Sequence, residues 1–233
     1  MGIDVWVRRE PVAETVTPVA AEPAPVPVSP AAEPTPASAP GSDVATLDWA
    51  ALEARVADCT LCDLHATRTK PVFGVGHREA RLMFVGEAPG AEEDRQGEPF
   101  VGRAGKLLDA MLRAIGRDRN SVYIANILKC RPPNNRDPKP EEAAACTPYL
   151  WRQIALVQPD LIVALGRIAA QRLLDTSSSL ARLRGTVHEL APTGTPLIVT
   201  YHPAYLLRSP GEKRKAWQDL KFARDFVARR SAS

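Results

Sequence analysis

Four short and almost continuous apolar segments occur along the chain, at residues 81–86, 122–126, 161–166 and 196–201. Apolar runs of this length, without polar alternation, are typical of strands that are buried on both faces of a sheet. Such strands occur mainly in parallel sheets that are covered by helices, so the pattern predicts a parallel sheet.

Amphipathic segments lie between and around these runs. A helix is expected after Gly102, with an apolar face made of Leu107, Leu108, Met111, Leu112 and Ile115. Pro140 and the acidic residues after it indicate the start of another helix, which we expect Pro148 to kink. Further helices are expected at residues 49–56 and 217–227. Strands and helices therefore alternate, which predicts an α/β layered fold whose ligands bind beyond the carboxyl ends of the strands.

The first 45 residues have a different composition. They contain nine prolines, many alanines and one aromatic residue, Trp6. Such a segment buries too little apolar area to offset the entropy lost on ordering, so we expect a disordered tether at residues 1–45 and a domain at residues 46–233. The tether begins with an apolar cluster, which either docks on a partner such as a replication or repair protein or is an unselected tail end. This cluster consists of Ile3, Val5, Trp6 and Val7.

Charge is distributed unevenly between these two parts. The first 45 residues carry two basic and six acidic residues, whereas the remainder carries 28 basic and 21 acidic residues. A basic domain fits a nucleic-acid-binding protein, although many other soluble domains have a comparable charge. No apolar run is long enough to span a membrane, and we expect a monomer in the cytoplasm, associated with the nucleoid.

The four cysteines are spaced as one short pair, Cys59 and Cys62, and one long pair, Cys130 and Cys146. No secretory signal precedes them, so we expect a reducing cytoplasm, in which disulfides are rare and metal-bound thiolates are stable. Zinc sites favour two short pairs, and the long second pair is better suited to an iron-sulfur cluster. Inert buried thiols and transient redox chemistry remain as alternatives.

Cys130 lies within a basic stretch that also contains Lys129, Arg131 and Arg136. Basic side chains of this kind suit contacts with phosphate groups, which add affinity without reading sequence. The stretch therefore predicts a phosphate-binding surface beside the cysteines.

Unusual residues follow three of the four predicted strands. They form two glycine-rich loops, a strand end and a Thr-Tyr-His-Pro turn, at residues 86–94, 97–102, 126 and 200–203. With these motifs, the basic stretch and the four cysteines in this order, the chain resembles the family 4 uracil-DNA glycosylases, the iron-sulfur branch of that superfamily. The resemblance runs from about Val56 to Val227.

The resemblance implies a three-layer α/β/α fold with a central four-stranded parallel sheet. It implies an enzyme that flips deoxyuridine out of single- or double-stranded DNA, hydrolyses its N-glycosidic bond and leaves an abasic site for base excision repair. It also implies a structural 4Fe-4S cluster that fastens the N-terminal helix to the loop after the second strand and positions Arg131 and Arg136. The implied ligands of this cluster are Cys59, Cys62, Cys130 and Cys146.

The same resemblance implies a set of uracil-binding residues: Gly86, Ala88, Glu93, Phe100, Asn126 and His202. Phe100 would stack on the uracil ring, and Asn126 would accept a hydrogen bond from N3–H and donate one to O4. Glu93 would lie near C5 and exclude the methyl group of thymine.

His202 is implied as the group that stabilises the transition state, because it would donate to uracil O2 as negative charge develops there. In the best-known branch of the superfamily, an aspartate that positions water stands where this chain has Ala88. Ala88 can activate no water, so the resemblance implies a dissociative reaction with an oxocarbenium-like sugar. Glu87 would then be an electrostatic or structural aid to catalysis.

Leu206, Leu207 and Arg208 lie where the superfamily inserts a wedge into the duplex. Apolar side chains there would fill the gap that the flipped nucleotide leaves. The alternative interpretation is a hydrophobic anchor for the last helix.

Other functions are weighed against excision. A uracil-trapping relative would carry an extra basic loop that has no counterpart between Asn126 and Cys146, and a non-catalytic DNA-binding module is the remaining alternative. A dinucleotide site is disfavoured, because Gly86 and Gly90 lack the G-x-G-x-x-G spacing.

Overall fold

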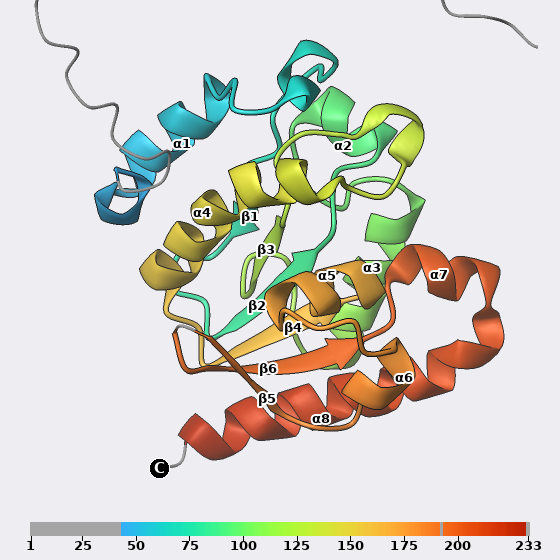
Figure 1. The fold of residues 1–233 in the computed structure, drawn as a ribbon. Helices are drawn as coiled ribbons and strands as arrows, with labels where there is room; N and C mark the ends of the chain where they lie inside the picture. Colours follow the sequence, from blue (N-terminus) through green and yellow to red (C-terminus); the bar gives the residue numbers. More distant parts are fainter. Residues whose placement is uncertain (1–42, 192, 232–233) are drawn as a thin grey trace, which may run out of the picture. The chain divides into compact units, whose positions relative to one another are not determined.

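A computed structural model describes residues 43–191 and 193–231 of the chain (Figure 1). The apolar cluster at the start of the predicted tether, and the tether up to residue 42, lie outside the described residues. Val44, which the prediction assigned to the tether, belongs to the same buried cluster as Leu52 and Tyr149. The folded domain therefore includes residues before the predicted boundary at residue 46.

One sheet of six strands forms the centre of the domain, in the order β1-β3-β2-β4-β6-β5. The four predicted strands are confirmed as its parallel core: β2 (Leu82–Gly86), β3 (Tyr123–Asn126), β4 (Leu161–Leu165) and β6 (Thr195–Thr200). Two antiparallel edge strands were not predicted, β1 (Val75–Gly76) and β5 (His188–Leu190), so the sheet is six-stranded and mixed rather than four-stranded and parallel. With two and three residues, these edge strands are too short to show a hydrophobic period.

Helices connect the strands. The α-helices of the described residues are α1 (Trp49–Ala57), α2 (Ala91–Gln96), α3 (Arg103–Ala114), α4 (Pro140–Val157), α5 (Arg167–Leu173), α6 (Leu180–Leu183), α7 (Pro203–Arg208) and α8 (Lys213–Ser231). Short 3-10 helices are η1 (Val44–Thr46), η2 (Asp63–Ala66), η3 (Pro133–Asn135) and η4 (Pro210–Glu212). Helix α4 continues through Pro148 as one element. Among these helices, none has the length and apolar character needed to cross a membrane.

The alternation of side chains along β2 divides the core into two layers. Met83 and Val85 belong to the cluster that contains residues of α4, α5 and α6, whereas Leu82 and Phe84 belong to the cluster that contains residues of α3, α7 and α8. Because successive side chains of a strand point to opposite faces, a strand that is apolar throughout requires helices on both sides. The predicted three-layer α/β/α arrangement is confirmed.

A third buried cluster joins the N-terminal helix α1 to α4. Its members include Leu52, Val56, Leu64, Leu128, Cys130, Cys146 and Tyr149. Two of the four cysteines are therefore part of the apolar contact that fastens α1 to the domain.

A buried ion pair fixes the end of β6. Asp219 of α8 is 4% exposed and accepts hydrogen bonds from two nitrogens of Arg184, at 2.8 Å each, and from the Thr200 hydroxyl at 2.7 Å. Thr200 is the last residue of β6, so this network holds the chain just before the turn that contains His202.

The strand order creates a crevice at the carboxyl ends of the central strands. β2 lies between β3 and β4, so the chain leaves β2 toward one side and later returns to pair with its other side. In parallel sheets, ligands bind in the crevice that such a reversal opens at the carboxyl ends of the strands.

Candidate active site

A cavity of about 410 Å³ lies at the carboxyl ends of β2, β3 and β6. Of the predicted uracil-binding and catalytic residues, all except Gly86 line it: Glu87, Ala88, Glu93, Phe100, Asn126 and His202. The fold thus brings together side chains from three strand ends that are far apart in the sequence.

Gly86 and Asn126 lie directly opposite one another at the ends of β2 and β3. Gly86 leaves the space that its neighbours occupy, because a Cβ atom there would lie 2.3 Å from Asn126 Oδ1 and 2.6 Å from the Phe100 ring. Asn126 is 2% exposed, and its Oδ1 has no hydrogen-bond partner among the described residues. A buried acceptor without a partner costs about 1–3 kcal/mol, so this atom marks a place where a ligand donor is expected.

Phe100 is held in a left-handed backbone conformation, with a φ of 56°. Its side chain is 5% exposed, and the centroid of its ring lies 5.6 Å from that of His202. Helix α3 approaches it closely, because a Cβ atom on Gly105 would lie 1.6 Å from the Phe100 carbonyl oxygen. The Phe100 ring therefore forms a fixed apolar wall of the cavity.

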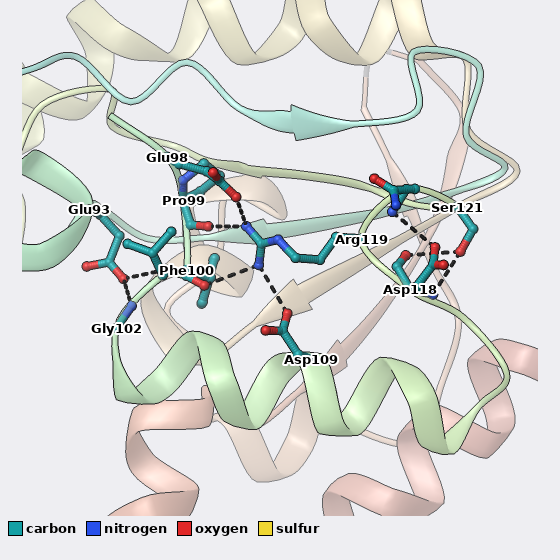
Figure 2. Close-up of polar contacts among 11 residues, drawn as sticks. Glu93, Glu98, Pro99, Phe100, Gly102, Asp109, Asp118, Arg119 and Ser121 are labelled. Carbon is teal, nitrogen blue, oxygen red and sulfur yellow. Dashed lines mark hydrogen bonds and ion pairs between the residues drawn. The ribbon is translucent and has the colours of Figure 1, made fainter. Parts of the chain in front are cut away.

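Arg119 fixes the loop that carries Phe100 (Figure 2). Its guanidinium donates to the carbonyl oxygens of Pro99 at 2.6 Å and of Phe100 at 3.2 Å. It also donates to the carboxylates of Glu98 and Asp109, which together with the carbonyls match its fork of N–H donors. Arg119 was not predicted as a site residue. It lies in the connection between α3 and β3, outside every sequence motif.

Glu93 supports the same loop (Figure 2). Its Oε1 accepts hydrogen bonds from the backbone N–H groups of Val101 and Gly102, each at 3.0 Å. Gly102 is the N-cap of α3, so the carboxylate satisfies free N–H groups and lies at the positive end of the helix dipole. This anchoring role was not predicted, and the contact of Glu93 with uracil C5 stays a prediction.

His202 enters the cavity as the N-cap of α7. Its Nδ1 accepts a hydrogen bond from the backbone N–H of Ala204 at 3.1 Å, so a neutral ring carries its proton on Nε2. Loss of hydration lowers the pKa of His202 to about 4, and the positive charge of Arg208 contributes to the shift. The ring is therefore neutral at pH 7 and offers Nε2–H as a donor. Gly166 leaves room for it, because a Cβ atom there would lie 2.8 Å from His202 Cβ.

Glu87 lines the same cavity, next to the apolar Ala88. Burial raises the pKa of Glu87 to about 7, the negative charge of Asp137 raises it further, and the positive charge of Arg167 opposes the shift. At neutral pH the Glu87 carboxyl group is therefore divided between its charged and its protonated form.

Two basic side chains of the stretch after β3 lie near the mouth of the cavity. Arg136 lines it and forms a bidentate ion pair with Glu142, at 2.8 and 2.5 Å. Arg131 donates to Asn135, a further lining residue, at 2.7 Å. Both arginines are partly exposed, so they remain available for the predicted phosphate contacts.

The predicted phosphate contact of Lys129 is wrong. Lys129 is 1% exposed, and its ammonium donates to the Asn126 carbonyl oxygen at 2.8 Å and to Gln153 Oε1 at 2.6 Å. Burial lowers the pKa of Lys129 to about 8, and the charges of Cys146 and Cys130 oppose that shift. The turn after β3 directs this side chain into the protein, whereas its basic neighbours stay at the surface.

The prediction of Leu206 as a wedge residue is also wrong. Leu206 is 1% exposed and belongs to the core cluster that contains residues of α3 and α8, which agrees with the alternative interpretation of an anchor for the last helix. Leu207 is 37% exposed, and Arg208 is exposed and lines the cavity. Tyr205, which was not predicted, lines the cavity and stacks on Tyr201 with 5.3 Å between the ring centroids.

The four cysteines line a second cavity, although they come from three separate segments: Cys59, Cys62, Cys130 and Cys146. Nη1 of Arg68 donates to the Cys130 sulfur at 3.1 Å, and the backbone N–H of Lys129 donates to the Cys146 sulfur at 3.2 Å. Burial raises the pKa of the Cys146 thiol to about 12. None of the four forms a disulfide.

The four thiols of this second cavity could provide the ligands of a metal centre. No group of three or more His, Cys, Asp or Glu side chains within residues 43–191 and 193–231 is arranged to hold a metal ion. A zinc site needs four ligands that converge on one ion, whereas each thiolate of a 4Fe-4S cluster binds a different iron. Four thiols around one cavity, with the guanidinium of Arg68 beside Cys130 and a backbone N–H beside Cys146, are compatible with a 4Fe-4S cluster.

Comparison with known proteins gives consistent matches. The family model of the uracil DNA glycosylase superfamily matches residues 73–221. A type-4 uracil-DNA glycosylase of Archaeoglobus fulgidus is 49% identical over 172 residues, which cover 71% of this chain and 86% of that protein. A type-4 uracil-DNA glycosylase of Thermotoga maritima is 47% identical over 176 residues, which cover 74% and 91%. A DNA polymerase of Bacillus phage SP01 is 32% identical over 142 residues, which cover 60% of this chain and 15% of that protein.

The tautomer of His202 can be tested directly. We expect the ring to stay neutral, with its proton on Nε2, as the pH falls from about 8 to about 5, because its pKa of about 4 lies below this range. Nitrogen NMR of protein labelled at histidine measures both the charge and the tautomer, and His202→Ala assigns the signal. A His202 signal that titrates near the ordinary histidine value, or that carries its proton on Nδ1, contradicts the derived donor.

Proposed function

Because the chain belongs to the uracil DNA glycosylase superfamily, we propose that it flips deoxyuridine out of DNA, hydrolyses the N-glycosidic bond and leaves an abasic site for base excision repair. The chain is accordingly a hydrolase of N-glycosidic bonds. The observation that supports this use of the cavity most strongly is the buried and unpaired Oδ1 of Asn126.

Base recognition follows from the groups around that atom. Uracil N3–H is a donor that pairs with Asn126 Oδ1, whereas cytosine presents an acceptor at the same position and leaves two acceptors facing each other. The Phe100 ring is placed to stack on the base. Gly86 supports the selection, because any side chain there would displace both Asn126 Oδ1 and Phe100.

Catalysis follows from the neutral His202. Cleavage of the glycosidic bond drives negative charge onto uracil O2, and a fixed N–H donor in a site shielded from water stabilises that charge. A neutral donor also leaves no positive charge to be neutralised before the base binds. The apolar Ala88 activates no water, so the bond breaks first and the sugar develops positive charge, toward which the ionised fraction of Glu87 contributes attraction.

DNA would be held by the exposed groups around the cavity mouth. Arg131, Arg136 and Arg208 supply positive charge for the phosphates on either side of the flipped nucleotide. The exposed Leu207 replaces the buried Leu206 as the side chain that fills the gap in the duplex.

A 4Fe-4S cluster held by the four cysteines is part of the proposal. Four thiols around one cavity support it, and the type-4 family of the relatives is consistent with it. Within this chain the ligands would join the segment after α1 to the stretch after β3 and to α4, which positions Arg131 and Arg136 near the DNA.

The N-terminal region completes the proposal. We infer that the residues before Val44 tether the domain to a replication or repair protein and that the enzyme acts as a monomer in the cytoplasm, associated with the nucleoid. Among the described residues, those that line the active-site cavity all follow Val56, as do the four cysteines, which supports a delivery role for the tether rather than a catalytic one.

Asn126→Asp tests the proposed base recognition. We expect kcat/KM for uracil excision to fall by at least about a hundredfold, because aspartate keeps an acceptor for uracil N3–H but loses the amide N–H that would donate to O4, and its carboxylate repels that oxygen. Excision is measured on uracil-containing oligonucleotides after alkaline cleavage of abasic sites. Asn120→Asp, the same change at an exposed position, should leave the rate unchanged.

Three outcomes of this assay decide against the proposal. Normal uracil excision by Asn126→Asp would remove Asn126 from the pocket. Wild-type protein that stays covalently attached to the oligonucleotide would identify a uracil-trapping relative, and protein that binds DNA without releasing uracil would identify a non-catalytic DNA-binding module.

Leu207→Ala and Leu206→Ala separate the wedge from the anchor. We expect Leu207→Ala to lower excision from duplex DNA about tenfold and to spare single-stranded DNA, which has no gap to fill. Leu206→Ala should instead lower the free energy of unfolding by about 2–5 kcal/mol, because it opens a cavity in the core. Single-turnover assays and urea unfolding measure the two effects, and a Leu207→Ala defect that is equal on both substrates excludes the wedge.

Iron content tests the cluster. Protein purified without oxygen should be brown and contain about four irons per chain, and Cys146→Ala should be colourless and less stable. Iron analysis and visible absorbance measure this. Colourless wild-type protein with stoichiometric zinc would refute the cluster while leaving the excision assay unaffected.

A further inference from the structure

Within the described part of the chain, Lys129 contacts Asn126, which lines the first cavity, and Cys146, which lines the second. Its ammonium donates to the backbone carbonyl of Asn126 at 2.8 Å, and its own backbone N–H donates to the sulfur of Cys146 at 3.2 Å. The side chain is 1% exposed, so water supplies it with little hydration. A buried cationic side chain thus contacts the backbone of Asn126, and the backbone of the same residue contacts the Cys146 thiol.

The buried ammonium needs a negative counter-charge. Burial of an unpaired cation is costly, and no carboxylate forms an ion pair with Lys129 in the part of the chain that the structure describes. The groups that can become negative beside it are the thiols of Cys130 and Cys146, which line the same cavity as Lys129. Thiolates that bind iron carry this charge, so a bound cluster would supply what the ammonium lacks.

The backbone between these two sites is short and well anchored. The N–H groups of Ile127 and Leu128 donate to the carbonyl oxygens of Gly86 and Glu87, each at 3.0 Å. The ammonium of Lys129 then closes the turn onto the Asn126 carbonyl. Any shift of Lys129 therefore moves the peptide group of the residue whose Oδ1 faces the base.

We propose that Lys129 is a positioning residue, whose ammonium is the counter-charge of the four-cysteine site and holds Asn126 in the geometry that distinguishes uracil from cytosine. The proposal rests on the proposed function, because it needs both the cluster and the base-reading role of Asn126. It gives the cysteine site an influence on base selection, beyond the fastening of α1 to the domain. Loss of the cluster then weakens discrimination before the fold is lost.

A purely structural role for Lys129 makes a different prediction. Gln153 braces the ammonium at 2.6 Å and is itself held by the carbonyl of Phe73 and the hydroxyl of Tyr123. If packing alone mattered, removal of this brace would have the same consequences as removal of the charge. Gln153→Met and Lys129→Met therefore separate the two roles.

The experiment uses the full-length protein purified without oxygen, and its iron content and uracil excision are measured first. Lys129→Met removes the charge and keeps the side-chain length, Lys129→Gln keeps a neutral donor, and Gln153→Met keeps the charge. Lys221→Met on α8, whose ammonium lies 5.8 Å from the centroid of the Trp217 ring, is the matched control. Each protein is compared for iron content, for the rate of iron release to a chelator, for kcat on uracil and for the ratio of uracil to cytosine excision.

We expect Lys129→Met to lower kcat on uracil about tenfold to a hundredfold, the usual effect of losing a charge-assisted hydrogen bond, and to lower the ratio of uracil to cytosine excision. Lys129→Gln should recover part of the rate, because its amide can still donate to the Asn126 carbonyl. Both Lys129 variants should release iron faster, because both lack the counter-charge, whereas Gln153→Met and Lys221→Met should release it at the wild-type rate.

Two results overturn the positioning role. One is a Lys129→Met protein, or a Lys129→Gln protein if Lys129→Met does not fold, with wild-type iron release and wild-type base selection. The other is a Gln153→Met protein with the same defects as the Lys129 variants, which would assign the effect to packing. Wild-type protein without iron refutes the cluster, and with it the counter-charge, whereas wild-type protein with iron but no uracil excision refutes the proposed activity.

Discussion

An unpaired hydrogen-bond acceptor at the end of a fully buried strand is the constraint on which the rest of this site depends. Asn126 Oδ1 would be more stable with a partner, by about 1–3 kcal/mol, and the surrounding structure keeps it without one. Three features hold it in place: the register that sets Asn126 against Gly86, the missing side chain at Gly86, and the ammonium of Lys129 on the Asn126 carbonyl. In the proposed function, discrimination between bases would thus be prepared before any DNA is bound.

The electrostatics of the cavity follow a similar logic. Loss of hydration keeps His202 neutral, and its Nδ1 accepts a hydrogen bond from a backbone N–H. Nε2–H is therefore the one ring N–H that can donate to negative charge on the base. The pKa of Glu87 is raised to about 7 in the same cavity, which Arg136 and Arg208 also line. In the proposed function, neutral groups would contact the base and charged groups would face the phosphates, so DNA binding and base selection would use different residues.

The loop of Phe100 shows how the domain stores a strained conformation. A φ of 56° is unfavourable for phenylalanine, and Arg119, Glu93 and the close approach of Gly105 together impose it. This conformation keeps the Phe100 ring rigid. A rigid ring would lose less conformational entropy on stacking with a base than a ring that moved freely.

The sequence by itself determined the four central strands, the helix layers and the convergence of residues from three strand ends, because apolar periodicity and the rules of parallel sheets depend on local order along the chain. It did not determine which members of a motif face inward. Lys129 belongs to a basic stretch and Leu206 lies between the exposed Tyr205 and Leu207, yet both are buried, since the turn after β3 and the packing of α7 on α3 decide their direction. Arg119 and the two edge strands carry no local signal at all. Their positions depend on contacts between segments that are distant in sequence, and only the tertiary structure brings those segments together.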